Sequence, residues 1–386
     1  MKKRNIYLMY AIALLQGMVF YGPIATLYRQ ANGVSIFQIT LIESISYILC
    51  ILFEVPWGMA ADRIGYKKTM VFCCGLYFVS KLVFWQAEGF GGFLLERILL
   101  AVVIAGFTGV DSSILFLSCG EGESHRVFGI YNSLSTVGML GASFVYSVAV
   151  GDHYRTAALL TVLSYGLAAV LSCFLSEVKG ADTGRFCFRE FREILVRILG
   201  NKPQLLFLTA VAFLTQTGQT IVVFLNQLQY QQCGMSSSAI GIVFLLVTLV
   251  ETLGVFSERI TRKVGVKHAG IVFYGGAVLA CLALCFTGSA FVSVCCILLL
   301  NLSGSLFRPL QTEAQNRQVV STNRATELSI YAILIDLLCA GISVAFGAFA
   351  RIRLEAAFFF GAVLSAAGLV LFRVWFYCHE KSEKHP

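Results

Sequence analysis

Twelve long apolar runs constrain this chain more than any other feature of its sequence. A helix needs about 20 apolar residues to cross the hydrocarbon core of a bilayer. The runs cover residues 6–28, 36–61, 69–87, 93–118, 127–149, 155–176, 204–228, 237–257, 268–288, 290–311, 325–349 and 354–378. Only helices and closed barrels satisfy every backbone group in lipid, and runs this long without alternation exclude a barrel. The sequence therefore predicts an all-α membrane protein with twelve transmembrane helices.

A polar segment divides these runs into two sets of six. We expect one six-helix bundle at residues 1–176, a second at 204–386, and a cytoplasmic linker at 177–203 between them. The linker mixes acids and bases, as in Arg189-Glu190-Phe191-Arg192-Glu193, with apolar residues at helical spacing. This pattern is typical of a helix that lies along a surface.

The two halves also repeat each other. The segment from Gly254 to Ile260 echoes that from Gly58 to Ile64, and the segment from Gly265 to His268 echoes that from Gly65 to Lys68. Weak internal symmetry of this kind is typical of carriers built from repeated helical units. We therefore expect two six-helix pseudo-repeats.

The cations lie mainly in alternate segments between the runs. If the N-terminus is inside, the inner segments hold 22 of the 29 Lys and Arg residues and the outer loops hold four, Arg29, Arg155, Arg351 and Arg353. The remaining three, Lys81, Arg97 and Arg308, lie within runs, whereas Arg155 and Arg373, near the ends of their runs, are counted with the adjoining segments. Because cytoplasmic loops carry the excess of cations, this bias predicts a multi-pass protein of the cytoplasmic membrane with both termini inside. It also accounts for the net charge of +8 without a nucleic-acid partner.

Lys81 lies near a helix end, where its ammonium is expected to extend to the membrane surface.

Several kinds of chemistry have no motif in this sequence. There is no G-x-x-x-x-G-K-S/T loop to hold a nucleotide phosphate, no H-E-x-x-H and no Ser/His/Asp set. The 13 cysteines lie mostly in apolar runs and show no C-x-x-C spacing, so we expect neither a metal site nor a disulfide framework. We predict a protein that is not an enzyme, has no catalytic residues and carries no cofactor.

A charged stretch between the second and third runs carries a family resemblance. Gly58, Asp62, Arg63 and Gly65, followed by Lys67 and Lys68, match the pattern G-x-x-x-D-R-x-G with basic residues after it, and Tyr66 fills a slot that is usually basic. The stretch resembles the loop that marks the major facilitator superfamily, and its lead-in, Glu54-Val55-Pro56-Trp57-Gly58, is similar to that of one bacterial branch with drug-efflux-type carriers. The resemblance implies the major facilitator fold over essentially the whole chain, with the substrate site between two rocking halves.

The same resemblance assigns the charged stretch to an inner gate. It implies that Asp62 contacts the N-terminal end of the eleventh helix when the cytoplasmic side is closed, and a carboxylate is stabilised at a helix N-terminus. The expected gate residues are Glu54, Gly58, Asp62, Arg63, Gly65 and Lys67, with Glu258 and Arg259 at the repeated positions.

Charges inside the first six runs are the next candidates, because each costs about 2.5–3.5 kcal/mol at the bilayer centre without a partner or a cavity. Glu43 and Glu54 share one face of the second helix, and Arg97 and Asp111 share one face of the fourth. Arg97 resembles a fourth-helix arginine of the superfamily, which implies a role in proton coupling. An equally open alternative is that Arg97 simply ties helices together through a carboxylate.

The second half supplies the remaining candidates. Arg308 stands near the repeat equivalent of Asp111, so we predict that this pair meets across the two halves. Asn301, Ser305 and Arg308 form one polar stripe on the tenth helix. Further candidates are Glu251, Asp336, Gln216, Gln219 and Asn226. The seventh-helix amides could equally bond neighbouring helices.

Three functions fit these features. The first is proton-coupled export of a small amphipathic compound, favoured by the membrane carboxylates and by 32 Phe and 15 Tyr. The second is uptake or facilitated diffusion of a polar nutrient through the seventh-helix amides, and the third is a non-transporting membrane sensor.

The fifth helix has Gly138-Met139-Leu140-Gly141 without the proline common in drug/proton antiporters, and Leu117 stands where a second acid is frequent. Both departures weaken a drug-antiport assignment. The expected partners are a small molecule, protons and the lipid bilayer, with the protein as a monomer.

Overall fold

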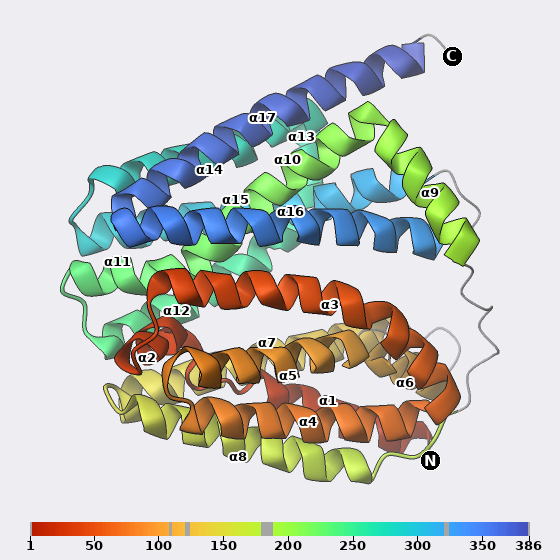
Figure 1. Ribbon diagram of the computed structural model, residues 1–386, viewed down its shortest axis with the longest axis vertical. Coiled ribbons are helices and arrows are strands. Elements are labelled where there is room, and N and C mark those ends of the chain that lie inside the picture. Colours follow the sequence, from red (N-terminus) through yellow and green to blue (C-terminus); the bar gives the residue numbers. More distant parts are fainter. Residues whose placement is uncertain (1, 108–109, 120–123, 179–187, 320–323, 385–386) are drawn as a thin grey trace. The chain divides into compact units, whose positions relative to one another are not determined.

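The structure is a computed structural model that describes residues 2–107, 110–119, 124–178, 188–319 and 324–384 (Figure 1). Within these ranges every regular element is a helix. Twelve helical stretches of the described chain are long and apolar enough to cross a membrane, and they coincide with the twelve apolar runs. The all-α fold with twelve spanning helices is therefore confirmed.

The chain divides into two compact units. Unit 1 comprises residues 1–184 and 236–245, and unit 2 comprises residues 185–235 and 246–386. The linker helix, α9 (Phe188–Gly200), belongs to unit 2, and the start of α12 (Ser237–Glu251) groups with unit 1.

Unit 1 contains the first six spans. Its elements are α1 (Lys2–Gly17), η1 (Gly22–Ile24), α2 (Ala25–Ala31), α3 (Ile36–Ile64), α4 (Tyr66–Gln86), α5 (Gly89–Phe107), α6 (Val110–Ser118), α7 (Ser124–Val145), the π-helix η2 (Tyr146–Val150) and α8 (Tyr154–Cys173). α5 packs between α3 and α4, and α4 also packs on α8, as Figure 1 shows. α1 packs on α7 and α8. These contacts bring α2, α3, α4 and α5 together at the end of unit 1 away from the N-terminus.

Two glycines let α1 and α7 approach closely. A Cβ at Gly17 would collide with the Ser135 carbonyl, and a Cβ at Gly138 would collide with the Leu14 carbonyl. Small residues at such crossings allow backbones to pack directly in a membrane, where apolar burial gives little net attraction. Gly138 therefore allows the close packing of α7 on α1, whereas Gly141 has no neighbour within 4 Å of a Cβ.

Unit 2 contains the linker helix and the last six spans. After α9 follow α10 (Lys202–Gln219), the π-helix η3 (Thr220–Leu225), α11 (Asn226–Gln232), α12, η4 (Thr252–Phe256), α13 (Ser257–Val264), α14 (Val266–Phe286), α15 (Ala290–Gln318), α16 (Arg324–Ile352) and α17 (Leu354–Lys384). α17 packs on α14 and α10, and the buried Tyr274 hydroxyl donates to the Ala210 carbonyl at 2.7 Å.

The linker helix α9 is held to unit 2 by both apolar and charged contacts. Ile194 and Ile198 are buried, and Arg197 donates to the buried Glu327 of α16 at 2.6 Å. The other oxygen of Glu327 accepts from Tyr331 at 2.6 Å. A helix within the linker was expected from the mixed charges there, and the structure confirms it.

The repeated glycines of the two halves occupy equivalent turns. Gly65 lies between α3 and α4 with φ +100°, and Gly265 lies between α13 and α14 with φ +82°. Only glycine adopts this left-handed region at little cost, so one residue reverses the chain in each half. The helix that follows has 21 residues in both cases.

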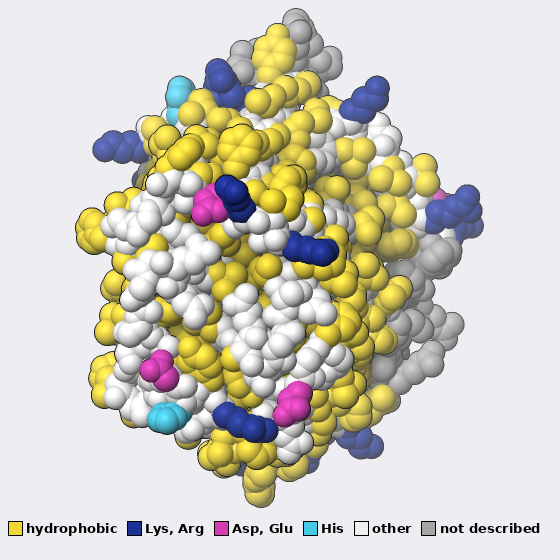
Figure 2. Space-filling view, turned by 60° about the vertical axis from the view of Figure 1, so that its left-hand side comes forward, with side chains coloured by type: hydrophobic (Ala, Val, Ile, Leu, Met, Phe, Trp, Pro, Cys, Tyr) yellow, Lys and Arg dark blue, Asp and Glu magenta, His cyan; other side chains and the backbone are white. Residues whose placement is uncertain are grey.

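The outer surface suits a lipid environment. Many large apolar side chains are exposed on spanning helices, including Phe286, Phe291, Val148 and Leu279. Figure 2 shows a face covered mostly by hydrophobic side chains, with few charged ones. An exposed apolar surface of this extent is normally an interaction surface, and here it matches the twelve spanning helices.

Candidate functional site

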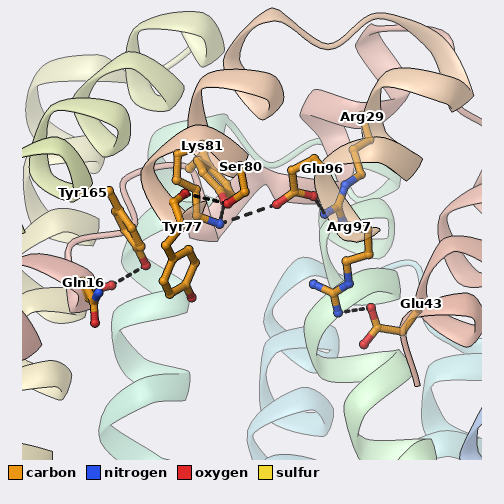
Figure 3. A network of polar contacts seen from close by, with 10 residues as sticks. Gln16, Arg29, Glu43, Tyr77, Ser80, Lys81, Glu96, Arg97 and Tyr165 are labelled. Atoms are coloured by element: carbon orange, nitrogen blue, oxygen red, sulfur yellow. Dashed lines mark hydrogen bonds and ion pairs between the residues drawn. The ribbon is translucent and has the colours of Figure 1, made fainter. Parts of the chain in front are cut away.

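Five charged side chains gather inside unit 1, and we call them the buried charge cluster. They are Arg29 on α2, Glu43 on α3, Lys81 on α4, and Glu96 and Arg97 on α5 (Figure 3). Each lies within about 12 Å of a helix end, at a rise of 1.5 Å per residue. The cluster exists because α5 packs between α3 and α4, and because Glu96 and Arg97, as neighbours on a helix, point in different directions.

Glu43 and Arg97 form the first part of the cluster. The Arg97 guanidinium donates to Glu43 Oε2 across the α3–α5 contact. The Arg97 side chain is 19% exposed and that of Glu43 is 7% exposed. The sequence indicates both residues as candidates without pairing them, and the structure brings them together. Each charge compensates the other, which removes most of the cost of placing either in the membrane.

Glu96 forms the second part, because it lies between two cations. Its carboxylate is 3.6 Å from Lys81 Nζ and 4.0 Å from the Arg29 guanidinium. The Glu96 side chain is 1% exposed and that of Lys81 is 4% exposed. Figure 3 shows Glu96 between the two cations. Glu96 was missed by the sequence reasoning; its place within the fourth run, beside Arg97, is the signal that could have found it.

Lys81 does not extend to the membrane surface, so that expectation is wrong. Its ammonium donates to the Tyr21 hydroxyl at 2.9 Å and lies 5.0–5.6 Å from the ring centroids of Tyr21, Tyr77 and Tyr165. The negative faces of aromatic rings attract a cation, most strongly when it is desolvated. Lys81 points inward because its side of α4 faces the bundle. The closeness of Lys81 to the helix end does not show which side of the helix it occupies.

Arg29 does not belong to an outer loop, which corrects a second expectation. It lies in α2 within the first spanning stretch, and its side chain is 9% exposed. Its guanidinium also lies 5.6 Å from the Phe84 ring centroid. The chain continues as a helix past the apolar run, and this extra turn places Arg29 against Glu96.

Asp111 and Arg308 each have partners within their own unit. Asp111, in the first turn of α6, accepts from the Ser112 amide at 2.6 Å and from the Tyr131 hydroxyl at 3.4 Å. Arg308 donates to Glu251 at 2.7 Å, and both side chains are exposed. The predicted pairing rested on the mirrored placement of the two residues and on the cost of leaving either charge alone. These local partners remove the second reason, and the pairing itself stays a prediction.

The polar candidates of the seventh span are mostly satisfied locally. Gln216 is fully buried and donates to the Thr220 hydroxyl at 3.0 Å, and the Asn226 side chain accepts from the Gln227 amide at 2.7 Å. Gln219 is half-buried at the end of α10. The π-helix η3 lies between these amides, and such wide turns often occur at functional sites.

Two further polar candidates of unit 2 lie in α15 and α16. Asp336 is half-buried in α16, and Asn301 on α15 donates to the Val247 carbonyl at 2.8 Å. Asn301 therefore ties α15 to α12 rather than leaving its amide free for a ligand.

The expected inner gate is described only in part. α3 continues to Ile64, so the charged stretch is helical up to Gly65 rather than a loop. The side chains of Glu54, Asp62 and Arg63, with Gly58, lie outside the described part of the structure. The Lys67 amide donates to Glu177 at 3.1 Å, so Glu177, which the sequence reasoning missed, caps α4.

The two charged residues at the repeated positions in unit 2 are exposed. Glu258 and Arg259 lie in α13, the helix that precedes Gly265. The Arg259 guanidinium lies 5.8 Å from the Phe256 ring centroid.

Comparison with known proteins adds a family and a fold. The model of the Major Facilitator Superfamily matches residues 6–340. YwbF, an uncharacterized transporter of Bacillus subtilis (strain 168), is 25% identical over 325 residues, which are 81% of this chain and 77% of YwbF. The nucleoside transporter NupG matches with a TM-score of 0.82 at 13% identity, over 97% of this chain and 98% of NupG. A D-xylose–proton symporter matches with a TM-score of 0.73 at 11% identity, over 96% of both chains.

Proposed function

The chain belongs to the Major Facilitator Superfamily and is a secondary carrier of small molecules in a membrane, and we propose that it couples transport to protons through Glu43 and Arg97. The observation that carries this proposal is the buried ion pair of these residues. A carboxylate that titrates inside a carrier is the usual means of linking a proton to a conformational cycle. Family membership also favours a carrier over the non-transporting sensor.

The pair can report protonation because its contact depends on charge. While Glu43 is ionised, it holds Arg97 and thereby joins α3 to α5. When Glu43 takes a proton, it loses the charge that attracts Arg97, and the guanidinium becomes free for another acceptor. A proton therefore changes both a helix–helix contact and the binding properties of the site. The remaining candidates, Asp111, Gln216, Gln219, Asn226, Arg308 and Asp336, are proposed as further lining of the pathway.

Two directions of transport have support. Export of an amphipathic compound is supported by the lead-in from Glu54 to Gly58, which is similar to that of drug-efflux-type carriers. Uptake of a polar nutrient is supported by the buried amides of the seventh span, and by the similar structures of a nucleoside transporter and a D-xylose–proton symporter. Proton coupling at Glu43 is compatible with either direction.

The cycle we propose is a rocking of the six-helix bundles 1–176 and 204–386, with the linker 177–203 between them. Asp62 and Arg63 would act as the inner gate rather than the substrate site, together with the repeated Glu258 and Arg259. The left-handed turn at Gly65 supports this role, because it holds the end of α3 directly against the start of α4. We propose that the protein works as a monomer.

Reconstitution tests proton coupling directly. The purified chain is placed in proteoliposomes with an internal pH-sensitive dye and a panel of lipophilic cations, sugars, nucleosides and organic acids. We expect an imposed pH gradient to drive flux of a substrate, and Glu43→Gln to retain exchange of that substrate while losing the response to the gradient. Glu313→Gln, in an exposed ion pair, is the matched control and should behave as the wild type. Exchange that ignores pH in the wild type would contradict the proposal.

A further inference from the structure

We propose that the substrate is an organic anion and that its carboxylate binds Arg97, in the place that Glu43 occupies while it is ionised. The inference rests on the proposed coupling role of Glu43 and Arg97 and extends it to the chemical class of the substrate. It starts from the charge balance of the buried charge cluster. Three cations and two carboxylates leave a formal charge of +1 when all are ionised.

A surplus positive charge is costly where this cluster lies. The five side chains are between 1% and 19% exposed, and they lie on helices that span the membrane. Such a charge persists where it has a function, most often as a substrate or ion site. Because the surplus is positive, it favours an anion and repels a cation.

The cations also lack part of their hydrogen bonding. Nε of Arg29 and Nε of Arg97 have no hydrogen-bond partner among the described residues, and both atoms are buried. Glu96 contacts Lys81 and Arg29 only at 3.6 Å and 4.0 Å, which is longer than a hydrogen bond. Donors left open in this way can donate to a further carboxylate oxygen.

Arg97 is the cation best placed to bind a ligand. Lys81 is enclosed by three tyrosine rings and already donates a hydrogen bond to the Tyr21 hydroxyl, while Arg29 lies between Glu96 and the Phe84 ring. Arg97 is the most exposed of the five, and the proposed protonation of Glu43 would release its guanidinium. A guanidinium presents a planar fork that binds carboxylates through two parallel hydrogen bonds.

The exchange of one carboxylate for another links the anion to the proton. Protonation of Glu43 adds one positive charge to the cluster, and a bound carboxylate removes it, so the loaded and empty sites have equal charge. The ionisable groups that interact with the pair are Glu96 on α5, Tyr47 and Cys50 on α3, and Arg29 on α2. The proton and the anion therefore travel in the same direction, and an inward proton gradient drives uptake.

Matched ligands test the inference without knowledge of the natural substrate. Thermal unfolding of the purified protein is followed at about pH 5 and about pH 8 with two sets of matched ligands, each with an anion, a neutral compound and an amine. The first set is benzoate, benzamide and benzylamine, and the second is glucuronate, glucose and glucosamine. We expect only an anion to raise the unfolding midpoint, and to do so more strongly at the lower pH. Arg97→Gln should abolish the shift, and Glu43→Gln should retain it without its pH dependence. Arg317→Gln, an arginine in an exposed ion pair, should bind as the wild type.

Each remaining outcome counts against the inference. It is overturned if the amines or neutral ligands stabilise the protein and the anions do not, if no anion shifts the midpoint, or if the shift survives Arg97→Gln. The double variant Glu43→Gln/Arg97→Gln carries no unpaired charge at this position and shows whether loss of binding reflects misfolding. Proton-driven flux of a neutral or cationic substrate in proteoliposomes would overturn only the anion class, whereas flux without any pH dependence would overturn the coupling.

Discussion

Glu96 supports two buried cations, which makes it the most consequential single side chain of unit 1. Lys81 and Arg29 both face its carboxylate, and the Glu96 side chain is only 1% exposed. Glu43, by contrast, has one partner and is more accessible. This difference supports the proposal that Glu96 belongs to the permanent scaffold of the site and that Glu43 is the carboxylate that couples to protons.

Replacing Glu96 should therefore destabilise the protein strongly. Glu96→Gln leaves two cations without a counter-charge, and removing one partner of a buried pair typically costs about 3–5 kcal/mol. Thermal unfolding in detergent measures the loss. Glu96→Gln combined with Lys81→Gln should recover part of it, because fewer unpaired charges remain. Glu313→Gln, in an exposed pair, should change stability by less than about 0.5 kcal/mol. A Glu96→Gln loss no larger than this control would contradict the scaffold role.

At the scale of elements, the crossing of α1 and α7 depends on direct backbone contact. Gly138→Ala should destabilise unit 1, because its methyl group would overlap the Leu14 carbonyl, and overpacking of this kind costs about 1–3 kcal/mol. Gly141→Ala, one turn further along α7, meets open space and should be neutral or stabilise by up to about 1 kcal/mol through helix propensity. Thermal unfolding of the two variants provides the comparison, and equal midpoints would show that the crossing relaxes freely.

The helices could be predicted from the sequence better than the contacts between them. Run length defines a spanning helix, so all twelve stretches could be placed, and the left-handed turns follow from Gly65 and Gly265. The face that a residue presents depends on packing partners, which run length does not contain. Lys81 was therefore misplaced and Glu96 overlooked, although both belong to the same cluster as Glu43 and Arg97, whose functional role stays a prediction.

At the scale of the whole molecule, the buried charge cluster lies toward one end of unit 1. Glu43 and Arg97 are in the third turns of α3 and α5, and Lys81 is in the last two turns of α4, so the cluster is far from the N-terminal end of α1. If the N-terminus is cytoplasmic, the cluster lies in the outer half of the membrane. Orientation thus decides from which side an anion first meets Arg97.

The cation bias predicts that both termini and the linker helix α9 face the cytoplasm. Single cysteines are introduced at two exposed positions, Arg189→Cys on α9 and Arg353→Cys before α17, in a background without the native cysteines. A membrane-impermeant maleimide applied to intact cells should label position 353 and leave position 189 unlabelled, while permeabilised cells should show labelling at both. Labelling of position 189 in intact cells would invert the orientation. In that case the buried charge cluster would lie in the cytoplasmic half of the membrane instead of the outer half.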